Sequence, residues 1–330
     1  MTSRVNNIAH THMNTNNFSA DSLLSSAFSG MKLQDSSNAD AVATLLDKYG
    51  LRWEVSKQEL LLPTGEDTGF FGIVREDNKK TFATCKDGYV PYQNSELAEL
   101  LIRISEKTGY EIHNGGSFNG GGKVYMQLNT GNHIADIGKD RTSVKGFITG
   151  INGHDGTTSL KWGNANITIS CSNTFASASR QLQQSARHTA SIHDRVEASI
   201  RQITGIVEAE KTLFDRFIQL SNVPVTKDNI AKIVQNITDV NINLHPSKAE
   251  KEYSSYAMNR SAELLTSIQR EMNGKGDTLW GLFSGVTHYT SHVLPVPKRE
   301  NARLESKYTG TGLSIDNDAF NMVMDFASMN

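Results

Sequence analysis

The sequence predicts an α+β protein, with an antiparallel β-sheet in β-hairpin–helix–β order in the N-terminal half and a helical C-terminal half. Up to residue 173, short segments of alternating hydrophobicity are separated by tight-turn pairs such as Asp87-Gly88 and Asp155-Gly156. Between them, apolar residues recur every three or four positions from Ser95 to about Lys107, which predicts a helix that ends at Gly109. Beyond residue 173, apolar residues follow helical spacing. An antiparallel sheet with a helix on one face accounts for this order.

Composition permits a folded core and excludes several classes of protein. Hydrophobic residues make up 37% and charged residues 21% of 330 residues, which suits one large domain or two modest ones. The formal net charge of −2 excludes a globally basic nucleic-acid coat, but it permits a local basic groove. Two cysteines, Cys85 and Cys171, cannot form a disulfide framework or a four-cysteine zinc site, and they favour a reducing compartment. Because no run of about 18 apolar residues occurs, we expect a cytoplasmic protein without membrane contact.

The chain divides into three predicted segments. Residues 1–37 are rich in Asn, Ser and Thr and predict a flexible polar arm with one short apolar helix. Residues 38–173 form the α+β sheet domain. Residues 174–330 form a helical region packed on it.

The elements of the sheet domain follow from local patterns. Asn38 or Asp40 can cap a helix that ends at Lys48, before Gly50. Alternating apolar residues predict extended segments over residues 51–62, 70–76, 81–86, 110–113, 123–128, 143–151, 159–162 and 166–171. The second and third of these form a hairpin, and the glycine-rich stretch 115–122 is a loop.

The helical region follows from apolar stripes. A stripe that includes Val196 and Phe217 predicts one helix from about Thr174 to Leu220. Further helices are predicted over residues 228–238, 247–273, 278–292 and 316–328. The aromatic residues of the helix over 278–292 indicate helix-packing core, with a subunit contact as the alternative; they are Trp280, Phe283 and Tyr289.

Several stretches together resemble a known family. They are RWEV (52–55), GIV…GYVPYQNSE (72–96), GGGKVYMQL (120–128), GINGHDGTTSL (150–160), ISCSNTF (169–175), TLWGLFSGVTHYTSH (278–292) and YTGTG (308–312). In order and spacing they resemble the phage/plasmid-like protein family, classed as a domain of unknown function, over roughly residues 50–328. Family members commonly carry an Arg-Val-like pair where Ile167, Thr168 and Ile169 stand here, so a phosphate contact from that arginine is not carried over.

The resemblance implies a protein of a phage or plasmid, acting in a bacterial host cell beside DNA recombination and replication functions. The family has no settled biochemical activity to carry over. The β-hairpin–helix–β order is similar in topology to the core of single-strand annealing proteins of the Redβ/RecT kind, which is a fold-level analogy.

Catalytic and metal motifs are incomplete. In the stretch Gly115–Lys123, Ser117 stands where a phosphate loop needs its first glycine, and Val124 where it needs a hydroxyl. This stretch is therefore either a mobile loop or a backbone that approaches a nucleic acid. His154-Asp155 belongs to a tight turn, and Cys171 is interpreted as a packing cysteine. Without an HExxH motif or clustered carboxylates, we expect no enzyme, no cofactor and no metal.

Local charge suggests a nucleic-acid interface. Residues 175–205 carry four arginines against two acids, and Arg180 and Arg187 lie two turns apart on the expected helix, with Arg195 beyond them. This surface either follows phosphates or is an ordinary solvated helix start. Lys86 and Lys123 add charge, and three aromatic residues could stack on bases: Tyr89, Tyr92 and Phe118.

These observations predict a non-catalytic phage or plasmid protein that binds and anneals single-stranded DNA in recombination or replication, as a homo-oligomer. The alternative is a protein-interaction factor of a mobile element, for host takeover or anti-defence, without nucleic-acid binding.

Overall fold

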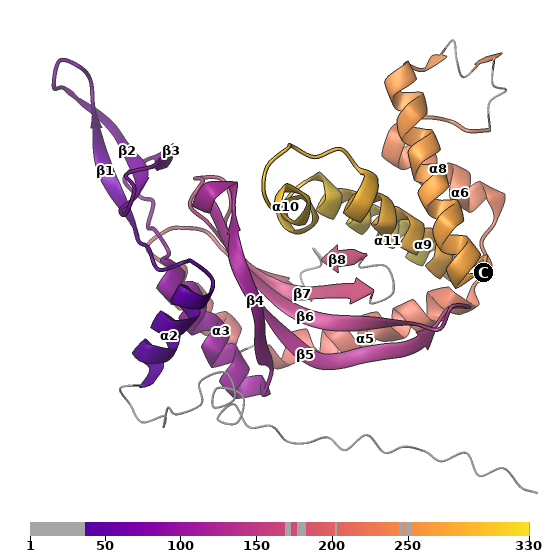
Figure 1. The fold of residues 1–330 in the computed structure, drawn as a ribbon, viewed down its shortest axis with the longest axis horizontal. Helices are drawn as coiled ribbons and strands as arrows, with labels where there is room; N and C mark the ends of the chain where they lie inside the picture. The colour runs from indigo at the N-terminus through magenta and orange to yellow at the C-terminus, as the bar shows by residue number, and fades with distance from the viewer. Residues whose placement is uncertain are drawn as a thin grey trace, which may run out of the picture.

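The computed structural model describes residues 37–168, 173–176, 183–201, 203–243, 247–248 and 252–329. It confirms the α+β class, with antiparallel sheets in the N-terminal half and helices in the C-terminal half (Figure 1). The predicted N-terminal arm lies outside the described residues, apart from Ser37. Within the described ranges, no helix combines the length and apolar content needed to cross a bilayer.

A small three-stranded sheet begins the fold. It follows helix α2 (Ser37–Lys48) and has the order β1 (Val55–Leu61), β2 (Asp67–Arg75) and β3 (Thr81–Cys85). The predicted hairpin is confirmed as β2 and β3, and β1 pairs antiparallel along β2. In Figure 1 this sheet projects away from the body of the protein.

Helix α3 (Asn94–Thr108) lies where the apolar periodicity predicted it. Gln93 and Glu96 form a capping box at its start, and Gly109, with φ of 73°, ends it. Its buried side chains pack on the large sheet, and Gly150 of that sheet leaves room for Leu97 and Leu101.

A curved antiparallel sheet forms the centre of the protein (Figure 1). Its order is β4 (Glu111–Phe118), β5 (Lys123–Ile137), β6 (Thr142–Gly153), β7 (Leu160–Thr168) and β8 (Thr174–Ala176), and β9 (Gln183–Ala186) also pairs with β7. The segments predicted over 159–162 and 166–171 are joined in the single strand β7 as far as Thr168. Residues 169–171 lie outside the described residues.

The predicted glycine loop is wrong in its first half. Gly115 and Gly116 pair with Met126 and Tyr125 as part of β4, and only the turn η1 (Asn119–Gly121) connects the strands. Glycine is needed at position 115 because a Cβ would lie 2.7 Å from the ring of Tyr49. These glycines therefore make room for aromatic rings, and they do not serve to make a loop mobile.

The long helix predicted from Thr174 to Leu220 is also wrong in its first part. The described residues there form strands β8 and β9, and helix begins at α4 (Ile192–Ile200), followed by α5 (Ile203–Asn222). Ala186 of β9 pairs with Leu160 and is buried with it, so tertiary pairing decides the local structure here. The sheet thus continues past residue 173, where the sequence placed its end.

The C-terminal helices are α6 (Lys227–Thr238), α8 (Ser255–Lys275), α9 (Leu279–His288) with the π-turn η2 (Tyr289–Val293), α10 (Ala302–Thr309) and α11 (Thr311–Ser328). Helices α9, α10 and α11 lie over the concave side of the sheet, where they contact β8, while α6 and α8 pack on these helices; α5 lies along the other side of the sheet (Figure 1). Most match the predicted ranges, whereas α10 was not predicted.

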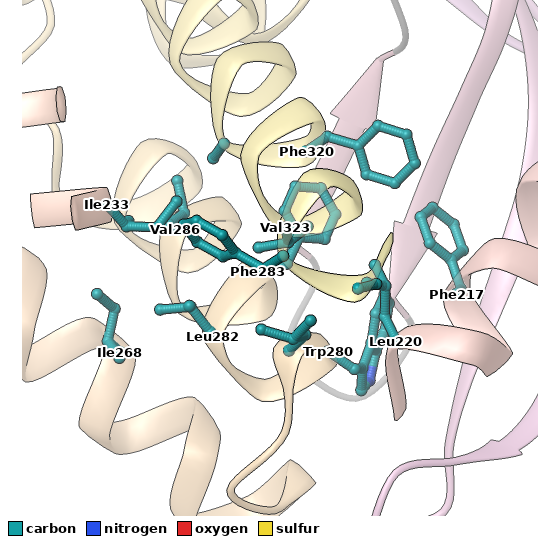
Figure 2. Close-up of a cluster of buried hydrophobic side chains, with 14 of the residues drawn as sticks. Phe217, Leu220, Ile233, Ile268, Trp280, Leu282, Phe283, Val286, Phe320 and Val323 are labelled. Atoms are coloured by element: carbon teal, nitrogen blue, oxygen red, sulfur yellow. The ribbon is translucent and has the colours of Figure 1, made fainter. Parts of the chain in front are cut away.

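An aromatic core joins α5, α9 and α11 (Figure 2). The ring centroids of Phe217 and Trp280 lie 5.1 Å apart, and those of Phe283 and Phe320 lie 5.4 Å apart. Trp280, Phe283 and Tyr289 are buried, which confirms their interpretation as packing core.

Replacing Gly285 with alanine is expected to lower the free energy of unfolding by about 1–3 kcal/mol. Gly285 packs α9 against α8, and a Cβ there would overlap the backbone of Ile268. Urea unfolding measures this loss. Gly205 of α5 has open space around it, so Gly205→Ala is the matched control and should raise stability by about 0.5–1 kcal/mol. Equal effects of the two substitutions would contradict this account.

Candidate nucleic-acid interface

The predicted binding arginines do not share a helical face. Arg187 is exposed but follows strand β9, and Arg195 is exposed on α4. Arg180 lies outside the described residues, and Lys86 is exposed directly after β3. The expected pair of Arg180 and Arg187 two helical turns apart is therefore corrected, because Arg187 does not lie in a helix.

Two of the three predicted stacking rings are buried. Phe118 is 1% exposed and stacks on Tyr125 at 4.7 Å, and Tyr92 is 3% exposed. Tyr89 is half-buried, stacks on the ring of His188 at 5.1 Å, and donates a hydrogen bond to the carbonyl of Gly153. Burial raises the pKa of Tyr89 and of Tyr92. The rings of Tyr92 and Phe118 therefore serve the core, not a nucleic-acid base.

Acidic neighbours also set Tyr92 apart from a phosphate-binding surface. It lines a small pocket with three glutamates, Glu96, Glu99 and Glu197. Glu197 pairs with Arg103, whose hydrogen bonds lower the pKa of this carboxyl. Phosphate groups would meet net negative charge here.

Lys123 is exposed to a cavity but carries acidic partners. Its Nζ lies 2.7 Å from Glu305 Oε1 and 3.6 Å from Asp155 Oδ2. It is therefore part of a charge cluster on the side of α10, far in the chain from Arg195 of α4.

A cationic hollow on the described surface lies between α3, α4 and α5. This basic pocket has a volume of about 450 Å³ and is lined by Lys107, Thr108, Tyr110, Ile200, Arg201, Val207, Glu208 and Lys211. Three cations thus face one acid. Among the described residues, no carboxylate lies within 4.0 Å of the charged groups of Lys107, Arg201 or Lys211.

Local structure explains why the cations gather there. Lys107 lies in the last turn of α3 and Arg201 directly after α4, at helix C-termini, where the helix dipole favours positive charge. Lys211 is an exposed residue of α5 that faces the same hollow. Tyr110 forms part of its wall and is half-buried, and burial raises the pKa of its phenol. The pocket thus offers positive charge beside an aromatic ring.

Sequence reasoning found one member of this pocket. Arg201 belongs to the basic stretch 175–205, but Lys107, Tyr110 and Lys211 lie far from it in the chain. No local pattern links these residues, because only the packing of α3 against α4 and α5 brings them together.

The family described as Domain of unknown function (DUF932) matches residues 81–309. The chain belongs to the DUF932 family. The DUF932 region begins with β3 and ends with the last residue of α10, so it contains the large sheet and the basic pocket. Comparisons with curated proteins and with solved structures gave no match.

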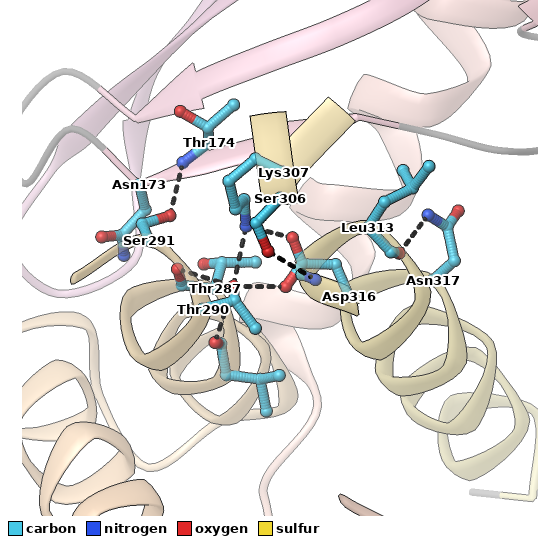
Figure 3. Close-up of polar contacts among 12 residues, drawn as sticks. Asn173, Thr174, Thr287, Thr290, Ser291, Ser306, Lys307, Leu313, Asp316 and Asn317 are labelled. Carbon is cyan, nitrogen blue, oxygen red and sulfur yellow. Dashed lines mark hydrogen bonds and ion pairs between the residues drawn. The ribbon is translucent and has the colours of Figure 1, made fainter. Parts of the chain in front are cut away.

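A buried polar cluster at the C-terminal end of the DUF932 region, completed by Asp316 beyond it, joins the helices to β8 (Figure 3). Thr290 of η2 accepts a hydrogen bond from Lys307 Nζ at 2.7 Å, and Lys307 forms an ion pair with Asp316. Beside them, Ser291 accepts a hydrogen bond from the amide of Thr174. These groups lie inside the protein, so the cluster holds the fold together rather than presenting a reactive surface.

The HDG turn of the DUF932 region is also structural. His154 bonds through Nε2 to Asn94 Oδ1 at 3.0 Å, and His188 bonds through Nε2 to Asn152 Oδ1 at 2.8 Å. Asp155 accepts the amides of Thr157 and Thr158, as a turn aspartate does. Across the described ranges, no group of three or more His, Cys, Asp or Glu residues is placed to hold a metal ion.

Proposed function

We propose that the chain binds single-stranded DNA for a phage or plasmid and promotes annealing in recombination or replication, without covalent chemistry. The basic pocket is the single observation that carries this proposal. It places three cations and one acid, Glu208, beside one aromatic ring, and no carboxylate of the described residues lies within 4.0 Å of those three cationic groups. Cations can follow phosphates, and a ring can stack on an unpaired base.

The local nature of the charge favours a flexible strand over a rigid duplex. The protein as a whole carries a net charge of −2, and the acidic pocket of Glu96, Glu99 and Glu197 also involves α3 and α4. A duplex would need a longer cationic track, whereas a single strand can bend a few phosphates into one hollow. Unpaired bases are also the ones available for stacking.

Annealing further requires several copies, because one pocket contacts only a few phosphates. A homo-oligomer would align such pockets and raise the affinity for a long strand through effective concentration. The β-hairpin–helix–β order and the stretches that resemble a phage/plasmid-like family support this proposal as analogy.

Replacing Arg201 and Lys211 together with glutamine is expected to weaken binding to a labelled 30-nucleotide oligonucleotide at least tenfold. Each lost phosphate contact should also reduce the slope of log affinity against log salt by about 0.7. Gel shifts at several salt concentrations measure both quantities. The matched control is Lys139→Gln with Lys227→Gln, which removes the same charge from exposed sites outside the pocket. An unmodified protein that gives no shift at low salt would refute the proposal.

A second candidate function is the protein-interaction factor of a mobile element. Three large apolar side chains are exposed where β1 connects to β2 in the projecting three-stranded sheet: Leu61 at 56%, Leu62 at 48% and Phe70 at 45%. This function would be favoured if the chain captures a host or phage protein, if the captured protein remains after nuclease treatment, and if the double variant Leu61→Ser with Phe70→Ser no longer captures it. Loss of the captured protein on nuclease treatment would favour DNA binding.

A further inference from the structure

A second cavity lies between the start of β5, the start of α8 and the helices α10 and α11. Its volume is about 370 Å³, and no residue lines both this cavity and the basic pocket. Three cations and one acid lie in its wall: Lys123, Arg260, Arg299 and Glu305. We call it the α10 cavity.

The cations of the α10 cavity are held in position before any ligand arrives. Glu305, which is 7% exposed, pairs with both Lys123 and Arg299. Lys123 Nζ also donates a hydrogen bond to Thr309 Oγ1 at 3.3 Å. Fixing these long side chains in the free protein reduces the entropy lost when a ligand binds.

Positive charge remains in excess after these pairings. Arg260 donates to the hydroxyl of Tyr289 and to the carbonyl of Ile237, and no carboxylate of the described residues lies within ion-pair distance of it. Within the cavity wall itself, three cations face Glu305 alone, whereas Asp155 behind Lys123 and Asp239 near Arg260 lie outside that wall. The cavity therefore favours an anionic ligand.

The rest of the wall suits a ligand with a flat ring. Tyr256 is 64% exposed, and the guanidinium of Arg260 lies 5.8 Å from the centre of its ring. Pro295 and Pro297 add apolar wall, while Thr309 and Thr311 add hydroxyl groups. Cationic and hydroxyl groups beside an exposed aromatic ring suit a phosphate joined to a base, and the volume is near the lower end for small-molecule pockets.

We propose that the α10 cavity binds a mononucleotide, with its phosphate against Arg260 and Arg299 and its base against Tyr256. Two stretches distant in the sequence meet at this site: Lys123 directly follows the glycine run 120–122, and Gly310 and Thr311 belong to the YTGTG stretch. This site is separate from the DNA-binding proposal, because it uses other residues and a ligand of one nucleotide.

Isothermal titration calorimetry of the full chain with AMP, adenosine and inorganic phosphate tests this assignment. AMP is expected to bind with one site per chain, and both adenosine and inorganic phosphate at least tenfold more weakly. Arg299→Gln should weaken AMP binding at least tenfold, whereas its exposed neighbour Lys298, which lies outside the cavity wall, should tolerate the same substitution. Absence of binding by AMP at millimolar concentration, or equal affinity for AMP and inorganic phosphate, would overturn the assignment.

Two further variants separate this site from folding and from the basic pocket. Tyr256 is exposed and outside the buried core, so Tyr256→Ser should fold normally, weaken AMP binding several-fold and leave phosphate binding unchanged. The Arg201→Gln with Lys211→Gln variant should bind AMP like the unmodified chain. If that variant alone loses AMP, the nucleotide occupies the basic pocket and the α10 assignment fails, while the DNA proposal stands.

Discussion

Replacing Asp316 with leucine is expected to lower the free energy of unfolding by about 3–5 kcal/mol. Lys307 is 1% exposed and Asp316 is 0% exposed, so the substitution leaves a buried ammonium group without its counter-ion. Thr290 cannot compensate, because its hydroxyl is neutral and already accepts a hydrogen bond from Lys307 while donating to Asp316. Urea unfolding followed by circular dichroism measures the loss.

The matched control removes both charges. The double variant Lys307→Met with Asp316→Leu should be at least 2 kcal/mol more stable than Asp316→Leu alone, because well-packed apolar residues replace a buried ion pair at little net cost. A loss below 1 kcal/mol in Asp316→Leu, with no recovery in the double variant, would show that the pair contributes little.

This buried ion pair gives a structural role to two stretches, HYTSH and YTGTG, whose role the sequence alone does not reveal. Thr290 comes from the stretch HYTSH, and Lys307 comes directly before YTGTG. Their side chains meet at the ion pair that joins η2, α10 and α11 (Figure 3). These stretches therefore have a folding role that needs no reactive group.

Elements with a strong local signal were predicted well. Helix α3 has both an apolar period and the stop residue Gly109, and the hairpin of β2 and β3 has alternating apolar strands around a polar turn. The aromatic helix α9 was also placed correctly, with Trp280 in the core.

The errors occur where a distant partner decides the local structure. The residues around β8 and β9 are rich in Ser, Ala and Gln, and both strands are extended because β7 supplies hydrogen-bonding partners. Gly115 was assigned to a loop because glycine is common in loops, but it lies in a strand where Tyr49 requires the space. Both candidate ligand sites combine residues more than 90 positions apart, such as Lys107 with Lys211, so no local pattern could indicate them.

Stability is expected to fall by on the order of 3 kcal/mol between pH 7 and pH 5, because two histidines are buried in the neutral form. Burial lowers the pKa of His154 to about 3 and that of His188 to about 4, from the usual 6.5. The two asparagine oxygens accept the Nε2 protons, and His154 Nδ1 is buried without a hydrogen-bond partner among the described residues. A second proton on that ring would therefore have no acceptor.

The sign follows from the lowered pKa values. Below pH 6.5, each of the two histidines binds a proton in the unfolded chain but stays neutral in the folded chain. Stability therefore falls as the pH falls, until the pH reaches the pKa of the folded state. Urea unfolding at pH 7, 6 and 5 measures the slope for the unmodified chain and for the variant His154→Gln with His188→Gln, which keeps an amide donor at each position. The double variant should lose most of the pH dependence, whereas His133→Gln, at an exposed position of β5, should keep it. If the unmodified chain and the double variant lose the same stability from pH 7 to pH 5, these two histidines do not cause the loss.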